Sequence, residues 1–159
     1  MTSQPTTTRI YVYVDADACP VKDEIYRVAA RHGLPVSVVA GNFIRVPQDP
    51  LIERIAAGSA MDAADDRIAE RAGAFDIVIT ADIPLAADVI AKGGRVLDPR
   101  GELHTPDTIR ERLAMRDFME ALRSSGVQTG GPEALSQADR KRFAGQLDRL
   151  LANVDAKDG

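Results

Sequence analysis

Asp15 and Asp17 are the residues whose type and spacing most favour chemistry in this chain of 159 residues. They follow an apolar run at positions 10–14, which predicts a buried strand. They precede Pro20, which suits the first turn of a helix. Because open parallel sheets bind ligands beyond the carboxyl ends of their strands, we expect these two carboxylates to lie at a site.

Further aspartates fall at similar places along the chain. Asp82 and Asp98 each follow a predicted strand, and three more stand in the first turns of a predicted helix: Asp62, Asp65 and Asp66. Asp62 shares a helix face with each of the other two, because neighbours on a helix surface are three or four residues apart. Two carboxylates ~4 Å apart repel by roughly 4 kcal/mol at an effective dielectric constant of about 20. A converging cluster must therefore take up protons or bind a cation.

Oxygen ligands select hard cations, so the expected cofactor is Mg²⁺ or Mn²⁺. The histidines and the cysteine of the chain are too few to favour a zinc site. The predicted metal ligands are Asp15, Asp62, Asp65 and Asp82. Such an ion activates water for attack on a phosphodiester and stabilises the leaving oxygen. The predicted catalytic acids are Asp15, Asp17, Asp65 and Asp82, and the predicted phosphate-binding residues are Lys22, Arg45 and Arg100.

Each of these acids, taken singly, also suits a structural place, because Asp caps helix N-termini and favours the helix dipole. Asp66 and Asp98 fit a surface or turn position better than a site. Cys19 fits a small buried residue. The arginines at positions 110–123 alternate with acids, which favours ion pairs along a helix over contacts with a nucleic acid.

The elements that must position these residues alternate between strands and helices. Strands are predicted at 10–14, 36–40, 51–57, 76–80 and 95–97, and helices at 20–32, 61–72, 84–92, 105–124 and 136–153. The segment 51–57 also suits a helical turn, and we favour the strand. This order predicts βαβ units with a parallel sheet in a single α/β domain over residues 10–153. Residues 1–9 are predicted to be a disordered leader and residues 154–159 a frayed tail.

The composition of the chain limits which partners and which location in the cell we expect. The formal net charge of -4 argues against a surface that coats nucleic acid throughout. No apolar run approaches the roughly 20 residues that span a bilayer, and the start of the chain lacks signal-peptide features. We therefore expect a cytoplasmic protein without membrane association. The sequence leaves the oligomeric state open.

Six segments carry a family resemblance: DADACPVK (15–22), DAADD (62–66), ITADIPLA (79–86), PRGE (99–102), IRERLAMRDFM (109–119) and TGGP (129–132). They resemble the YaiI/YqxD family of uncharacterised bacterial proteins over residues 10–151. That family is grouped with PIN-like domains. The resemblance implies a three-layer domain with a central, mostly parallel sheet flanked by helices, plus C-terminal helices.

The resemblance also implies a metal-dependent nuclease, because PIN-like nucleases cut RNA or flap-type nucleic acids with acids at the strand ends. It implies Asp15 as the acid after the first strand, Asp82 as the acid of the Thr-x-Asp motif, and Asp62 or Asp65 as the middle acid. One segment departs from the family pattern. Residues 54–61 are rich in alanine, where a cleaner strand followed by glycine and an aromatic residue is expected.

The sequence thus favours a PIN-like nuclease that uses Mg²⁺ or Mn²⁺ to hydrolyse phosphodiesters of RNA or another nucleic acid. Two alternatives stay open. An apolar strand before Asp-x-Asp also begins the haloacid-dehalogenase phosphatases, in which Asp15 would be the nucleophile and Asp17 the general acid. Those enzymes usually carry Thr or Val where this chain has Cys19. The other alternative is a non-enzymatic protein that binds metal or RNA through the same acids.

Overall fold

The computed structural model describes residues 10–58, 60, 62–128, 130 and 134–158. Within them, six strands form one sheet in the order β3-β2-β1-β4-β5-β6. The strands are β1 (Val12–Asp15), β2 (Val36–Ala40), β3 (Ile52–Ala56), β4 (Ile77–Ile79), β5 (Arg95–Leu97) and β6 (Leu103–His104). All neighbouring strands pair in parallel except β5 and β6, which are antiparallel.

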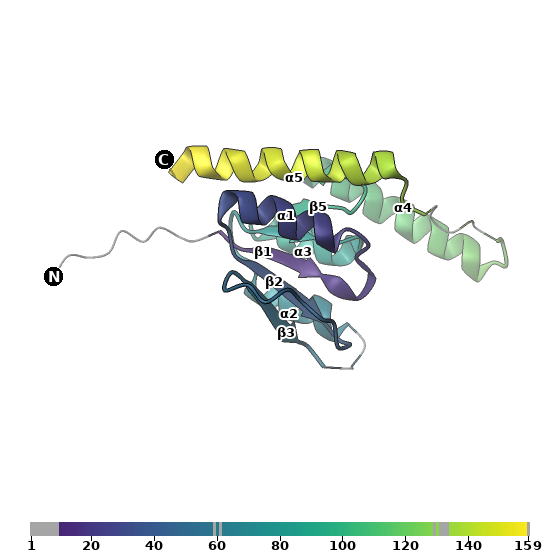
Figure 1. Cartoon of the computed structure of the whole chain (residues 1–159). Helices are drawn as coiled ribbons and strands as arrows, with labels where there is room; N and C mark the ends of the chain where they lie inside the picture. Colours follow the sequence, from purple (N-terminus) through teal and green to yellow (C-terminus); the bar gives the residue numbers. More distant parts are fainter. Residues whose placement is uncertain (1–9, 59, 61, 129, 131–133, 159) are drawn as a thin grey trace.

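Helices cover both faces of this sheet, so the domain has the three α/β layers that were predicted. One face packs against α1 (Lys22–His32) and α5 (Gln137–Asp158), which lies along α1 in Figure 1. The other face packs against α2 (Ala63–Arg71) and α3 (Ile83–Ala91), with α4 (Pro106–Ser124) packed on α3. The alternation of side chains in β1 explains the arrangement: Val12 and Val14 belong to the first core and Tyr13 to the second. The fold is consistent with a PIN-like architecture.

The sheet order places a switch point between β1 and β4. From β1 the chain passes through α1 to β2 and β3 on one side, and it returns beyond β1 to place β4 and β5 on the other. The helices that follow β1 and β4 pack on opposite faces of the sheet. The carboxyl ends of these two adjacent strands therefore border an open crevice, which is where open α/β sheets bind ligands.

The segment 51–57 is a strand, as predicted, because β3 pairs with β2 along its whole length. Several bounds shift by one or two residues, and the differences from the prediction include the following three. Helix α1 begins at Lys22 instead of Pro20, because a 3-10 turn at Ala16–Ala18 and a further turn come first. Strand β6 was missed, since two residues show no periodicity and its pairing depends on the turn that follows β5. Helix α5 continues past its predicted end at Asn153 to Asp158.

Helix α5 is fixed to α1 by apolar and charged contacts. Phe143 and Leu147 are fully buried in the core on the α1 side. Arg140 donates from Nη1 to the carbonyl oxygen of Pro20 at 2.8 Å and pairs with the buried Glu24 at 3.2 Å. The C-terminal helix thereby holds the turn that joins β1 to α1. In the described part of the chain, no helix has both the length and the apolar character that crossing a membrane requires.

Candidate functional site

All five of the predicted catalytic and metal-binding acids line one crevice. A cavity of about 340 Å³ at the carboxyl edge of the sheet is lined by Asp15, Asp17, Asp62, Asp65 and Asp82, with Gly41, Asn42, Gly58 and Ala60 also in its wall. Asp15 comes from the end of β1, Asp65 from the first turn of α2, and Asp82 from the start of α3. The fold therefore brings acids from three separate segments of the chain to one small volume.

Hydrogen bonds fix the positions of Asp15 and Asp82. The Thr80 hydroxyl donates to Oδ2 of Asp15 at 2.8 Å and accepts the backbone N–H of Asp82 at 3.0 Å. Asp82 is the N-cap residue of α3, because its Oδ1 accepts the backbone N–H of Leu85 at 2.9 Å. Thr80 is buried, so this link between β1 and α3 is protected from water.

The carboxylates perturb one another. Burial raises the pKa of Asp15, and the charges of Asp82 and Asp17 raise it further, while the Thr80 hydrogen bond lowers it. Burial, a hydrogen bond with Asp82 and the charges of Asp15, Asp82 and Asp62 raise the pKa of Asp65 to about 7. Without a cation, Asp65 therefore shares its proton with the neighbouring carboxylates near neutral pH. A divalent cation would replace that proton and relieve the same repulsion.

Asp62 lies in an unusual backbone conformation at the entrance of α2. Its φ is 64°, in the left-handed region, and its side chain makes no capping hydrogen bond to the helix. Aspartate tolerates this region better than most residues do, because its short polar side chain bonds locally. The exposed carboxylate of Asp62 stays at the cavity wall instead of capping α2.

Asp17 has different hydrogen-bond partners from Asp15 and Asp82. Its Oδ2 accepts the backbone N–H of Gly41 at 2.8 Å and its Oδ1 accepts that of Asn42 at 3.2 Å. The loop after β2 is thus tied to the loop after β1. A Cβ on Gly41 would lie 2.9 Å from the carbonyl oxygen of Gly58, so glycine is required for this close approach. Both oxygens of Asp17 are engaged in positioning the cavity wall.

We expect Asp17→Ala to lower the free energy of unfolding by about 1 kcal/mol, because two backbone donors lose a charged acceptor at an exposed position. Mn²⁺ affinity should stay within about threefold of the wild type, because both oxygens of Asp17 are engaged by the backbone. A threefold change in affinity corresponds to less than about 1 kcal/mol of binding free energy. Urea denaturation and metal titration measure the two quantities. Asp117→Ala, at an exposed position of α4, is the matched control. A loss of Mn²⁺ affinity as large as that of an Asp15 variant would instead make Asp17 a metal ligand.

The three predicted phosphate-binding residues do not line the cavity. Lys22 donates from Nζ to the carbonyl oxygens of Cys19 at 2.8 Å and Ala16 at 3.3 Å, so it stabilises the turn after β1. Arg100 pairs with Asp139 of α5 at 3.2 Å. Arg45 is exposed on the loop between β2 and β3. Their role in phosphate binding stays a prediction.

Arg116, which the sequence predicts to be a helix-surface residue, is a cation near the acids. It reaches from α4 to an adjoining cavity of about 230 Å³, which is also lined by Asp62, Asp65, Asp66, Asp82 and Asp88. Other arginines of α4 pair with acids: Arg110 with Asp107, Arg112 with Glu102, and Arg123 with Glu120. Arg116 has no such ion pair among the described residues. The α4 sequence alone gave no signal for this, because only the packing of α4 on α3 brings Arg116 here.

An exposed aromatic residue follows the cavity residue Asn42 in the sequence. Phe43 follows Asn42 in the loop after β2, and 75% of its surface is exposed. The Arg54 guanidinium lies 4.4 Å from the centre of its ring. Arg54 and Phe43 thus form a cation–π contact at the surface.

Comparisons with known proteins agree with the motifs found in the sequence. Residues 13–153 match the family described as "Uncharacterized BCR, YaiI/YqxD family". A "UPF0178 protein" of Rhodopseudomonas palustris (strain BisB18) is 61% identical over 143 residues, which cover 90% of this chain and 92% of the relative. "UPF0178 protein bll3966" of Bradyrhizobium diazoefficiens is 57% identical over 157 residues, covering 99% and 92% respectively. "UPF0178 protein BAV3236" of Bordetella avium is 56% identical over 150 residues, covering 93% and 97%. No solved structure matches the chain.

Proposed function

This chain belongs to the YaiI/YqxD family of uncharacterised proteins, and we propose that it is a nuclease that hydrolyses phosphodiesters of RNA with a divalent cation bound at the acidic cavity. The observation that carries the proposal is the meeting of Asp15, Asp65 and Asp82 at the switch point of the sheet, where burial and neighbouring carboxylates raise the pKa values of Asp15 and Asp65. A site that holds this much negative charge is prepared for a cation.

The chemistry follows from the ligand type. Carboxylate oxygens favour Mg²⁺ or Mn²⁺, and either ion keeps coordination positions for water and for phosphate oxygens. When bound, the cation supplies an activated water and stabilises the charge that develops on the leaving oxygen. Asp15 and Asp82 are the preferred ligands, because their backbone and hydroxyl partners hold both carboxylates in place. In this proposal Asp65 and Asp62 complete the set, and Asp65 also accepts a proton from water.

Two further features support a single-stranded nucleic acid as the substrate. Arg116 supplies a guanidinium for a phosphate next to the acids, and Phe43 offers a stacking surface in the loop after β2. RNA is the class of substrate that the resemblance to PIN-like nucleases implies. Binding of the nucleic acid through a few local contacts agrees with the overall charge of -4.

The direct test is cleavage of single-stranded RNA by the full chain in the presence of Mn²⁺. We expect products in Mn²⁺ or Mg²⁺ and none when EDTA removes the cation, because the proposed mechanism depends on a bound cation to activate water and stabilise the leaving oxygen. A radiolabelled or fluorescent oligonucleotide resolved on a gel measures both. Cleavage that persists in EDTA, or phosphate trapped covalently on Asp15, would contradict this mechanism. The latter result would instead support the phosphatase alternative.

A further inference from the structure

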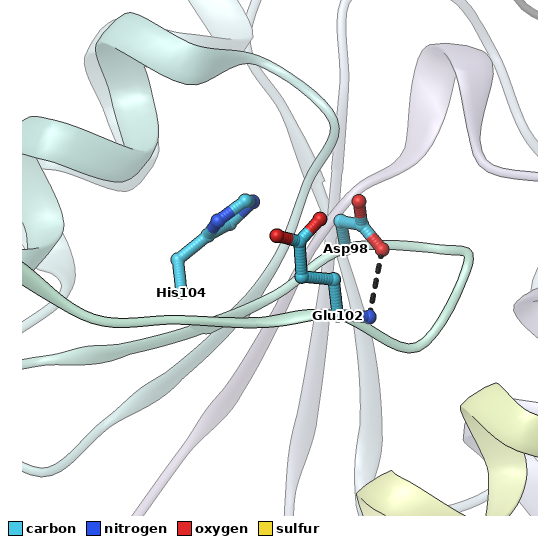
Figure 2. Close-up of side chains that lie close together, drawn as sticks. All are labelled: Asp98, Glu102 and His104. Carbon is cyan, nitrogen blue, oxygen red and sulfur yellow. Dashed lines mark hydrogen bonds between the residues drawn. The ribbon is translucent and has the colours of Figure 1, made fainter. Parts of the chain in front are cut away.

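A second cluster of ligating side chains lies away from the acidic cavity, at the turn between β5 and β6. Asp98, Glu102 and His104 each offer one ligand atom, and these atoms all lie within 4.8 Å of one another. In Figure 2 the Glu102 carboxylate lies between the Asp98 carboxylate and the ring of His104. None of the three residues lines the acidic cavity.

The histidine gives an independent reason to expect a ligand. His104 is 5% exposed, and its Nδ1 is buried without a hydrogen-bond partner among the described residues. A buried polar atom without a partner costs about 1–3 kcal/mol, so such atoms are rare in folded proteins. A cation bound to Nδ1 of His104 would give this atom a partner and would neutralise the two carboxylates.

Each carboxylate keeps an oxygen for such a cation. Asp98 accepts the backbone N–H groups of Arg100 at 2.9 Å and Glu102 at 3.0 Å, both at Oδ1, which leaves Oδ2. Glu102 pairs with Arg112 through Oε2, which leaves Oε1. The remaining oxygens and the imidazole are thus the ligand atoms to consider.

The turn that carries the cluster is held in place by α5. Gly101 has a φ of +93°, and a Cβ there would lie 3.0 Å from the backbone nitrogen of Phe143 in α5. Arg142 of α5 donates from Nε to the carbonyl oxygen of Arg100 at 3.1 Å. Because α5 holds the turn from one side, the ligands keep their spacing without a bound ion, which lowers the entropy cost of binding one.

We propose that Asp98, Glu102 and His104 form a second metal site, which takes a divalent first-row transition cation such as Zn²⁺. Two carboxylate oxygens and one imidazole leave one position of a four-coordinate ion for water. The imidazole favours Zn²⁺ over Mg²⁺, which distinguishes this site from the all-oxygen acidic cavity. The cation would join the end of β5 to His104, next to the N-cap residue Thr105 of α4.

The test is calorimetric titration of the full chain with Zn²⁺ in excess Mg²⁺, which occupies the all-oxygen site. We expect Glu102→Gln and His104→Gln to weaken Zn²⁺ binding by at least about tenfold, because loss of a ligand costs no less than loss of its supporting partner. Glu111→Gln, at an exposed position of α4, and Asp82→Asn, in the acidic cavity, should bind Zn²⁺ like the wild type. Zn²⁺ should also raise the melting temperature of the wild type but not of Glu102→Gln.

The outcomes separate this site from the nuclease proposal. If Glu102→Gln binds Zn²⁺ as tightly as the wild type, the second site is overturned. If, in addition, Asp82→Asn loses Zn²⁺ binding, the ion binds at the acidic cavity instead. Circular dichroism shows whether His104→Gln folds. If it does not, Asp98→Asn takes its place and must weaken binding as Glu102→Gln does. RNA cleavage is not part of this readout, so failure of one proposal leaves the other standing.

Discussion

Asp15→Asn and Asp82→Asn should each lower the proposed Mn²⁺-dependent RNA cleavage by at least about 10³-fold, because a cation held by these carboxylates would be worth several kcal/mol of transition-state stabilisation. Both substitutions preserve shape. The amide oxygen introduced at position 15 still accepts the Thr80 hydroxyl, and the one at position 82 still caps α3, since asparagine and aspartate are equally good N-caps. Each substitution removes the negative charge of the carboxylate, which would attract the cation.

The measurement is kcat/KM for a fixed oligonucleotide, together with the Mn²⁺ affinity of each variant. Asp117→Asn removes the same charge at an exposed position of α4 and should leave both values unchanged. Thermal melting shows that the variants fold. If Asp15→Asn and Asp82→Asn both cleave at the wild-type rate, neither carboxylate holds the catalytic cation and the nuclease proposal fails.

The second large effect is on stability. Without divalent cations, Asp65 should make the wild type less stable as the pH rises from about 4 to above 7. In the unfolded chain this carboxyl titrates near its ordinary pKa of 3.8, and in the folded chain its pKa is raised to about 7. Between these values the folded state binds the extra proton, so the free energy of unfolding falls with rising pH and the destabilisation is complete above pH 7. The raised pKa of Asp15 acts in the same direction.

Asp65→Asn should remove this effect. Because Asp65 is only partly buried, solvent screening reduces the gain, and we expect the variant to exceed the wild type by about 1 kcal/mol at pH 8 in EDTA. The two proteins should converge near pH 4. Saturating Mn²⁺ should reverse the order, since a bound cation stabilises the wild type by about 2.7 kcal/mol at a hundred times its dissociation constant. Urea denaturation across this pH range measures each quantity, and identical pH profiles for both proteins would contradict the electrostatic account.

Local sequence determined the type of most elements. The apolar runs at β1 and β4 became buried strands, and Thr105 and Asp82 became helix caps. These signals are readable because hydrophobic periodicity and capping depend on near neighbours. Strand β6 lacked such a signal, because its pairing with β5 depends on a turn held against α5.

The sequence also determined which acids stand at strand and helix ends, and the sheet order then decided which of them meet. Asp15 and Asp82 meet because β1 and β4 are neighbours, whereas Asp17 accepts hydrogen bonds from the backbone of the loop after β2. The neighbours of Arg116 and His104 were determined only by the tertiary structure. Helix α4 brings Arg116 to the acids, and the β5–β6 turn brings His104 to two carboxylates. Residue types and local spacing can be read from the sequence, whereas contacts between distant segments form only when the elements pack around the core.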